Sequence, residues 1–553
     1  MSLKGLCENE YRVFGVPGSG KTTYLTKKVQ GAVEKGYKGD LLVASFTRAA
    51  AAELAGRDMN LGNHQIGTLH AHCYGALGQP TIAETKVTEF NEEHPDFAMS
   101  KKTDSNVDEQ DSNLSGETRI DELFAEYNLN RNRKVPREVW KPSIKALAEK
   151  WEDFKAQTGY FDFTDLIEHG LSDMIYPPNR ARVGIFDEVQ DFTPLQMDLI
   201  RHWAKSMKYL MIAGDDDQAI MTFMGATPDT FLDPQIPDER ITTLGASYRC
   251  PSEIQAFAQR FLTNIKKRQE KPQQPRKEGG EVNTIRVSYK MPRPLIKMIE
   301  QDIKEENDLG NPRTIMVLTS CSYMLYPIRR ELRERGIPFH NPYRRSAGAW
   351  NPLSRSPTAT PSRILAYLNP RGPYMGQYQL WTAHQLQLWF ELIKSNGLLQ
   401  KGAKKKLNEF IEQRTDYDPD ALLDLYMELF HSEGLEQAVQ LDPGWLRQHT
   451  TADKYKRMDF PMRILHAQGK ESLERVPQVI IGTIHSTKGG QCDTVYLAPD
   501  LSMRSAQDYA KGYGTEGYEA IMRQFYVGAT RARERLNLLI PANTIQSVKE
   551  VFK

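Results

Sequence analysis

The sequence predicts an α/β protein of two lobes, each with a parallel sheet and each interrupted by a mainly helical insertion. Three observations support this fold class. A strand, a glycine-rich turn, a helix and a second strand follow one another within residues 11–46. Short apolar runs typical of strands buried on both faces recur along the chain. They form two groups separated by helical and irregular sequence, and the strand–helix–strand order favours parallel sheets.

The first strand–helix–strand unit is the clearest. Residues 11–14 form an apolar-rich run that ends at Gly15, residues 21–35 have helical periodicity, and residues 41–46 are nearly all apolar. Further strands are predicted at 183–186, 209–213, 315–318, 479–481, 495–497 and 536–540.

The stretches between the strand groups lack such runs. Residues 101–118 are rich in Asp, Ser, Asn and Gln and predict a mobile loop within a helical insertion. Segments 389–398 and 421–430 are amphipathic and indicate a second helical insertion, and the basic, proline-containing residues 265–280 predict a linker or flexible loop. The predicted organisation is a first lobe in 1–74 and 161–243 with its insertion at 75–160, and a second lobe in 244–345 and 476–553 with its insertion at 346–475.

Composition limits the class of protein. The 553 residues suggest roughly three or four domains at about 150 residues each. Lys and Arg total 72 against 71 Asp and Glu, so a polyanion must be bound by local patches and a histone-like basic protein is excluded. Five scattered cysteines without a Cys-x-x-Cys pair argue against zinc ribbons and disulfide frameworks. No segment resembles a signal peptide or reaches the roughly 20 apolar residues of a membrane span, so we expect a cytoplasmic protein.

The glycine-rich turn matches the G-x-x-x-x-G-K-[ST] pattern of a P-loop, with a strand before it and a helix after it. Glycines let consecutive backbone N–H groups converge on phosphate oxygens at a helix N-terminus. Lys21 is then expected to reach the β- and γ-phosphates, and the Thr22 hydroxyl to bind Mg²⁺. The expected nucleotide contacts are Gly15, Val16, Pro17, Gly18, Ser19, Gly20, Lys21, Thr22 and Thr23. A chance glycine turn is the alternative.

Carboxylates follow two of the predicted strands. Asp187 and Glu188 come directly after residues 183–186, where one carboxylate can bind the metal and its neighbour can activate a water molecule. Residues 214–218 read Gly-Asp-Asp-Asp-Gln after the next strand. Three adjacent acids would repel one another if all were buried, so some must face solvent, cations or capped N–H groups. The amide of Gln218 could sense a γ-phosphate.

Nine segments, in this order, resemble motifs of the UvrD/Rep-like superfamily-1 helicases. They are the P-loop GKT, FTRAAAAEL (46–54), GTLHAHC (67–73), FDFTDL (161–166), DEVQD (187–191), GDDDQAIMTFMGA (214–226), SYRCP (247–251), GTIHSTKGGQCD (482–493) and FYVGATRAR (525–533). The resemblance spans most of the chain. It implies two RecA-like P-loop lobes with ATP bound between them and single-stranded DNA crossing both.

The resemblance also assigns roles to individual residues. Tyr248 matches the tyrosine that stacks on adenine, and Arg249 and Arg531 match the arginines that neutralise the γ-phosphate. A planar guanidinium suits that task better than a lysine. The implied catalytic set is Lys21, Glu188, Gln218, Arg249 and Arg531, with Tyr248 as a further nucleotide contact and Thr22 and Asp187 at the metal.

DNA contacts are implied at Phe46, Thr47, His70, Phe223 and His485, where Phe223 would stack on a base. His70, His72 and Cys73 raise the alternative of a metal site. Because no fourth ligand lies at a suitable spacing, we favour the DNA-contacting interpretation.

The chain departs from the family pattern at several positions. The residues before Gly15 include no Gln, so the family's upstream adenine-reading motif is shortened or absent. Met221 and Met224 stand where the family usually has Tyr and Arg, and Gly490 and Gln491 where it usually has Leu and Glu.

The resemblance implies an ATP- and Mg²⁺-dependent DNA helicase or translocase that acts 3′→5′ on single strands and duplex junctions in replication, repair or recombination. Its compact size suits a phage or plasmid protein working in a bacterial host cytoplasm. Two alternatives remain. One is a DNA-stimulated ATPase that strips proteins from single strands without unwinding, and the other is a P-loop kinase acting on a small molecule, which would leave Tyr248, Arg249 and Arg531 without a purpose.

Overall fold

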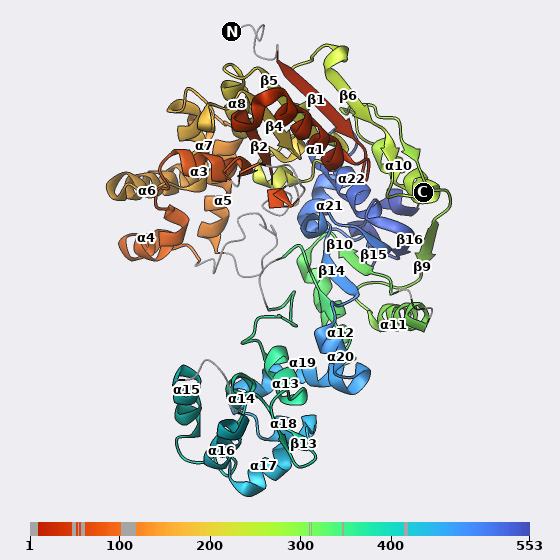
Figure 1. Ribbon diagram of the computed structural model, residues 1–553. Coiled ribbons are helices and arrows are strands. Elements are labelled where there is room, and N and C mark those ends of the chain that lie inside the picture. The colour runs from red at the N-terminus through yellow and green to blue at the C-terminus, as the bar shows by residue number, and fades with distance from the viewer. Residues whose placement is uncertain are drawn as a thin grey trace. The chain divides into compact units, whose positions relative to one another are not determined.

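The computed structural model describes residues 9–46, 51–52, 55–56, 61–62, 64–100, 118–308, 310, 312–344, 348–413 and 419–552. Thr47 and nearly all of the predicted loop at 101–118 lie outside these ranges. The chain divides into two compact units, which are considered separately (Figure 1). The first comprises Met1–Arg286, Leu318–Tyr323 and Gly482–Lys553, and the second Val287–Val317 and Met324–Ile481.

The first unit contains a parallel sheet. Within the described residues it has six strands in the order β3-β2-β4-β5-β1-β6, with every neighbouring pair parallel. The strands are β1 (Glu10–Gly15), β2 (Leu41–Ser45), β3 (Ile66–Thr68), β4 (Val183–Asp187), β5 (Tyr209–Gly214) and β6 (Ile241–Leu244). Ser45 pairs with Asp187 and Phe14 with Gly214, so the carboxyl ends of β1, β2, β4 and β5 share one edge. The four strands predicted in this part of the sequence are confirmed.

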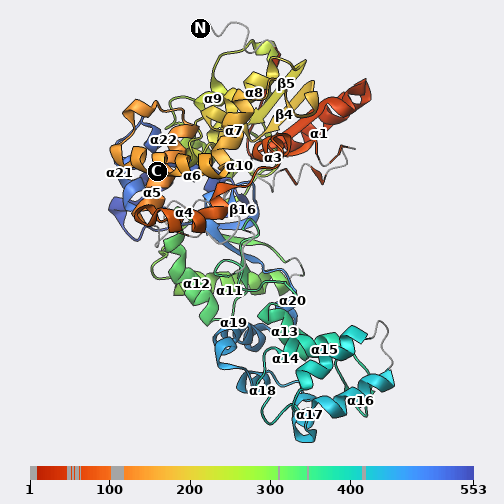
Figure 2. The ribbon, with the colours of Figure 1, turned by 90° about the vertical axis from the view of Figure 1, so that its left-hand side faces the viewer.

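Helices cover both faces of this sheet because successive strand residues point to opposite sides. Val13 and Val43 share an apolar cluster with Val29 of α1 (Lys21–Ala32). Phe14 and Leu42 belong to a second apolar cluster. This cluster also includes residues of α3 (Leu69–Ala76), α7 (Phe163–Ser172) and α8 (Pro194–Ala204). Figure 2 shows β4 and β5 between α1 on one side and α7 and α8 on the other. This double burial explains why the strands are apolar throughout.

A second sheet has the order β11-β14-β10-β15-β16-β9 among the described residues. Its strands are β9 (Glu281–Ile285), β10 (Ile315–Thr319), β11 (Phe339–His340), β14 (Val479–Thr483), β15 (Cys492–Leu497) and β16 (Ala532–Leu539). β15 pairs in parallel with β16, β16 with β9, and β11 with β14. The two sheets confirm the predicted fold class, two RecA-like α/β lobes.

The remaining elements are mainly helical. The first unit also contains α4 (Val87–Glu93), α5 (Arg119–Asn132), α6 (Pro142–Thr158), α9 (Asp229–Leu232), α10 (Ser252–Leu262), α21 (Met503–Ala510), α22 (Glu516–Ala529) and the short pair β7 (Ala246–Ser247) and β8 (Gln274–Pro275). The second unit contains α11 (Arg293–Asp308), α12 (Leu325–Glu334), α13 (Thr360–Leu368), α14 (Ala383–Phe390), α15 (Ala403–Gln413), α16 (Pro419–Leu429), α17 (Ser432–Ala438), α18 (Pro443–Gln448), α19 (Ala452–Gln468), α20 (Glu471–Glu474) and the hairpin β12 (Tyr374–Met375) and β13 (Tyr378–Gln379). No helix in the described ranges is long and apolar enough to cross a membrane.

Two sequence-based expectations need correction. The amphipathic segment 389–398 is helical only to Phe390, because Ile393 bridges to Thr450 and the chain then turns toward a second bridge at Leu399. The basic segment 265–280 is a connector, but it is anchored: Lys271 is buried and β8 pairs with β7. Tertiary contacts decide both cases.

A buried ion cluster joins α5 and α6 to α7. Arg131 of α5 pairs with Asp162, Asp165 and Glu168 at 2.6–2.7 Å, and Lys155 of α6 pairs with Asp162 and Asp165 at 2.6 Å. Asp162 also begins α7 as its N-cap, in a reciprocal capping box with Asp165. The FDFTDL segment therefore serves as a helix cap and as the attachment point of two helices from the predicted insertion.

Glu84 adds a pH-sensitive group to this cluster. Its Oε1 accepts a hydrogen bond from the Phe163 N–H at 3.1 Å, whereas Oε2 is buried without a partner. Burial raises the pKa of Glu84 to about 8, and the nearby charge of Asp162 contributes to the rise. A protonated, neutral Glu84 fits these surroundings.

Replacing Glu84 with Gln should therefore change the pH dependence of stability. A folded-state pKa above the unfolded value favours the folded state below pH 4.5, and that contribution is lost as the pH rises through about 8. Glu84→Gln has no proton to lose, so its free energy of unfolding should rise relative to the native protein by about 3–4 kcal/mol between pH 5 and pH 8.5. Urea unfolding at several pH values measures this difference. Glu138→Gln, at an exposed glutamate, is the control and should show no such pH dependence. A stability difference between Glu84→Gln and the native protein that stays constant with pH would contradict the raised pKa of Glu84.

Candidate nucleotide-binding site

The P-loop connects β1 to α1 at the shared edge of the first sheet. Gly18 and Gly20 have φ of +72° and +79°, in the left-handed region that favours glycine. A Cβ on Gly18 would lie 2.4 Å from the Cβ of Arg249, and one on Gly15 would lie 2.5 Å from the Cγ of Lys21. The glycine pattern is thus required both by the turn and by its close neighbours.

Residues 247–249 brace the loop from the side. The Ser247 hydroxyl donates to the Pro17 carbonyl at 2.8 Å, and the Tyr248 N–H donates to the Gly18 carbonyl at 3.0 Å. The Tyr248 side chain remains 67% exposed, which leaves its ring accessible beside the loop. The sequence gives no periodic signal for this contact, which joins segments about 230 residues apart.

The loop has properties that fit a bound phosphate. The Ser19 hydroxyl is buried without a hydrogen-bond partner. Lys21 is buried at the start of α1, and its Nζ donates to the Gly15 carbonyl at 2.9 Å. Thr22 follows on the same helix turn, and Asp187 lies at the end of β4 with its Oδ1 accepting from the Glu188 N–H at 2.9 Å. A hydroxyl and a carboxylate are suitable oxygen ligands for Mg²⁺ accompanying a nucleotide.

Glu188 has an unusual backbone conformation, and its side chain contacts a buried glutamine. Its φ is +56°, which is unusual for a residue with a side chain. Gln190 Nε2 donates to Glu188 Oε2 at 2.5 Å, while Gln190 Oε1 accepts from the Asp215 N–H at 2.9 Å. Gln190 therefore links the ends of β4 and β5. Its position within DEVQD is the signal that could have suggested this role.

Three cations act on the Glu188 carboxylate. Burial by itself would raise the pKa of Glu188, but the charges of Lys21, Lys488 and Arg531 and the hydrogen bond from Gln190 hold it below its usual value. The carboxylate is therefore ionised at neutral pH and able to accept a proton.

Arg531 reaches this centre from the far end of the sequence. The residue is 1% exposed, and its Nη2 donates to the Gln218 side-chain oxygen at 2.8 Å. Gln218 Nε2 in turn donates to Asp215 Oδ2 at 2.7 Å. Nε and Nη1 of Arg531 donate to the carbonyls of Val527 and Gly490, both at 2.9 Å. The structure thus brings Lys21, Glu188, Gln218 and Arg531 to one place.

Arg249 and Lys488 complete the surroundings. Arg249 Nε donates to Gln491 Oε1 at 3.1 Å, so one of the departures from the family pattern contacts a predicted arginine. Lys488 Nζ lies 2.5 Å from Asp191 Oδ2 and donates to the Gln218 carbonyl at 2.6 Å. Lys488 lies in the GTIHSTKGGQCD segment, but the resemblance to the family gave it no role.

Four of the residues expected to contact DNA lie in ring contacts that the structure describes. Phe223 and His485 form an edge-to-face pair with ring centres 5.4 Å apart. Phe46 packs against Phe192 at 6.1 Å, and His70 lies 6.1 Å from the ring of Phe163. Thr47 lies outside the described residues.

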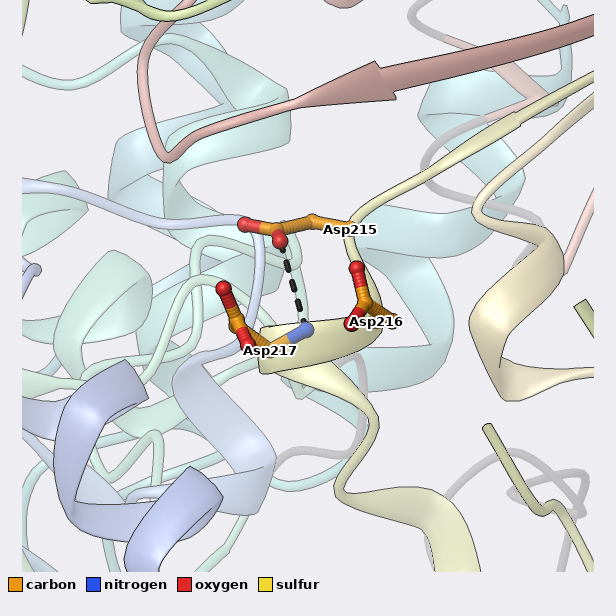
Figure 3. Close-up of side chains that lie close together, drawn as sticks. All are labelled: Asp215, Asp216 and Asp217. Atoms are coloured by element: carbon orange, nitrogen blue, oxygen red, sulfur yellow. Dashed lines mark hydrogen bonds between the residues drawn. The ribbon is translucent and has the colours of Figure 1, made fainter. Parts of the chain in front are cut away.

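The metal alternative at residues 70–73 gains no support. His72 is buried, and its Nε2 is 3.0 Å from the Val43 carbonyl. In the described part of the chain, the one acidic or His/Cys group compact enough for a metal ion is Asp215, Asp216 and Asp217 (Figure 3).

Comparisons with known proteins agree with this geometry. Residues 5–236 match the UvrD/REP helicase N-terminal domain family, and residues 390–542 match the UvrD-like helicase C-terminal domain family. The two matches include the P-loop, Glu188, Gln218 and Arg531.

Individual relatives are distant. The ATP-dependent DNA helicase UvrD2 of Mycobacterium tuberculosis is 26% identical over 281 residues, which is 44% of this chain and 40% of that protein. The ATP-dependent DNA helicase Rep of Buchnera aphidicola is 22% identical over 613 aligned residues, covering 97% of this chain and 91% of Rep. The helicase srs2 of Schizosaccharomyces pombe is 21% identical over 59% of this chain and 42% of that protein. The chain thus matches less than half the length of UvrD2 and srs2. The order of its motifs, the two domain matches and the convergence of Lys21 and Arg531 establish that the chain belongs to the UvrD/Rep-like family of superfamily-1 helicases.

Proposed function

We propose that the protein is an ATP-dependent DNA translocase and helicase that moves on single-stranded DNA. The observation that carries the proposal is the hydrogen bond from Arg531 to Gln218, residues 313 positions apart, beside the P-loop and the ionised Glu188. A site that gathers a phosphate-binding loop, a carboxylate base and a buried guanidinium is suited to hydrolysing a nucleoside triphosphate.

The proposed chemistry follows from the positions of these groups. Glu188 accepts a proton from the water that attacks the γ-phosphorus, while the bond to the bridging oxygen of the leaving diphosphate breaks. Lys21, Arg249 and Arg531 neutralise charge on the γ-phosphate oxygens as it spreads in the transition state. A magnesium ion bound with the nucleotide would neutralise further phosphate charge, and Thr22 and Asp187 are the side chains that would hold it. Tyr248 offers an exposed ring for the base.

Coupling to DNA is proposed through residues that share segments with this centre. Phe223 lies five residues after Gln218, and His485 lies three residues before Lys488, whose Nζ contacts the Gln218 carbonyl. A strand bound at the Phe223–His485 pair would therefore act on the turns that hold Gln218 and Lys488. Movement in the 3′→5′ direction, and work at duplex junctions in replication, repair or recombination, are proposed from the family alone.

Two other functions use parts of the same site. A single-strand ATPase that strips proteins from DNA needs the same motor and differs only in lacking strand separation. A small-molecule kinase needs the P-loop but gives no role to the buried Arg531 or to the aromatic pair. The contacts of Arg531 favour the motor over the kinase.

Single-stranded DNA should stimulate ATP hydrolysis at least tenfold, because the proposed DNA contacts join the turns that carry catalytic groups. Phosphate release with and without an oligonucleotide measures this effect, and displacement of a labelled strand from a 3′-tailed duplex distinguishes a helicase from a stripping ATPase. Equal hydrolysis rates in both conditions, together with phosphorylation of a small acceptor, would favour the kinase.

Glu188→Gln should retain nucleotide binding and lose turnover by ~10²–10⁴, because the amide keeps the size of the side chain but accepts no proton. Rates of phosphate release and nucleotide titrations on the same preparation test this. The exposed Glu138→Gln is the matched control. Turnover near that of the control would remove Glu188 from the role of base.

Arg531→Ala should lower kcat by ~10³–10⁵ while nucleotide affinity changes much less, because the P-loop supplies most ground-state contacts. DNA affinity without nucleotide should persist. Because Arg531 is buried, the folded state is checked by thermal unfolding, and Arg531→Lys provides a second variant that keeps one charge but not the planar fork. Arg504→Ala, at an exposed arginine, is the control. An unchanged kcat in a folded Arg531→Ala protein would overturn the proposed site.

A further inference from the structure

Asp215, Asp216 and Asp217 form the acidic group shown in Figure 3. The side chains of all three are fully buried, and the Asp217 N–H donates to Asp215 Oδ1 at 3.3 Å. Three buried carboxylates in sequence would repel one another strongly unless cations lay beside them. The question is therefore which groups provide the positive charge.

Lys271 occupies the centre of this group. Its Nζ lies 3.1 Å from Asp215 Oδ1, 2.5 Å from Asp216 Oδ1 and 2.9 Å from Asp217 Oδ2, and its side chain is also fully buried. Arg268 adds a two-pronged contact to Asp217 at 2.8 and 2.6 Å. The ammonium group fills the position that a metal ion would take, so the acidic group already has its counter-charge within the chain.

The connector that contains Lys271, residues 265–280, is also hydrogen-bonded to α22. Arg523 of α22 donates to the Asp216 carbonyl at 3.1 Å and to the Lys267 carbonyl at 3.0 Å. The Lys266 N–H donates to Glu519 of the same helix at 3.0 Å. α22 ends at Ala529, two residues before Arg531. The connector, the acidic group and the helix that leads to Arg531 are therefore tied together.

Asp215 links this cluster to the nucleotide site in two directions. Its carboxylate accepts from Gln218 Nε2, which leaves the Gln218 oxygen to accept from Arg531. Its backbone N–H donates to Gln190, which in turn donates to Glu188. A change in the position of Asp215 would thus move both the arginine and the proposed base.

We propose that Lys271 is a positioning residue for ATP hydrolysis, which acts through Asp215 and Gln218 to hold Arg531 and Glu188 in their working geometry. This proposal rests on the proposed ATPase function. Lys271 acts through Asp215 and Gln218 and is not proposed to contact the nucleotide. Its removal should therefore lower the rate of the chemical step more than the affinity for the substrate.

Lys271→Met is the first test, because it keeps the length of the side chain and removes the charge. With saturating ATP and single-stranded DNA, kcat should fall at least about tenfold, the cost of a loss of order 1.4 kcal/mol in transition-state stabilisation. KM for ATP and the Kd for an oligonucleotide should change less than about threefold. The exposed Lys290→Met serves as the control.

Lys271→Met leaves buried carboxylates without their partner and could unfold the protein. The double variant Lys271→Met with Asp216→Asn removes one of those charges while leaving Asp215 intact. If Lys271 positions Asp215, the double variant should recover thermal stability but keep the low kcat. Recovery of kcat together with stability would show that charge balance alone mattered and would overturn the proposal.

A third measurement combines Lys271→Met with Gln218→Ala. If Lys271 acts through Gln218, the combined loss in kcat should be much smaller than the product of the two separate losses. Independent, multiplying effects would contradict the proposed route. Absence of ATPase activity in the native protein would instead refute the proposed function itself, so the two failures are distinguishable.

Discussion

The candidate site depends on one hydrogen bond, from the buried guanidinium of Arg531 to the side-chain oxygen of Gln218. A buried charged group is tolerated only where acceptors surround it, and Arg531, a residue with 1% exposure, has three further acceptors in the Val527 and Gly490 carbonyls and the Thr530 hydroxyl. The amide of Gln218 can serve both neighbours at once because it donates to Asp215 and accepts from Arg531. A carboxylate or an aliphatic side chain at 218 could not do both.

The site around this bond contains concentrations of charge that the overall composition does not reveal. The chain is nearly neutral as a whole, yet the site concentrates cations near Glu188 and anions near Lys271. Glu188 has the charges of Lys21, Lys488 and Arg531 near it, and Lys271 contacts the three aspartates, so opposite charges lie close to these buried carboxylates. The result is an ionised Glu188 beside arginine and lysine groups suited to phosphate.

Close packing around the P-loop depends on the absence of a side chain at Gly18. Gly18 allows the backbone of residues 247–249 to approach, and the Cβ of Arg249 occupies the space that a side chain at position 18 would need. Arg249 then donates from Nε to the side-chain oxygen of Gln491, a position at which the chain departs from the family pattern.

The helices attached at Asp162 illustrate how a short motif combines two tasks. The Asp162 side chain accepts a hydrogen bond from the backbone of α7 as its N-cap. It also forms ion pairs with Arg131 of α5 and Lys155 of α6. Its pKa is lowered to about 2: burial alone would raise it, but the charges of Arg131 and Lys155 outweigh that effect. The cap and the ion cluster therefore stabilise each other.

The sequence by itself determined the fold class, the four inner strands of each sheet, the P-loop and the carboxylates after β4 and β5, because these depend on local periodicity and on the common edge of parallel strands. It did not indicate the edge strands β3, β6, β9 and β11. It also limited the possible surroundings of Asp215–Asp217, since adjacent buried acids need cations. Only the tertiary structure decided which cations those are, why segment 389–398 ends its helix at Phe390, and how Gln190 and Lys488 join the site. Lys271 lies in a stretch without periodicity, and its partner carboxylates are more than fifty residues away. Such contacts depend on side chains that fold topology brings together, and no pattern within one segment records them.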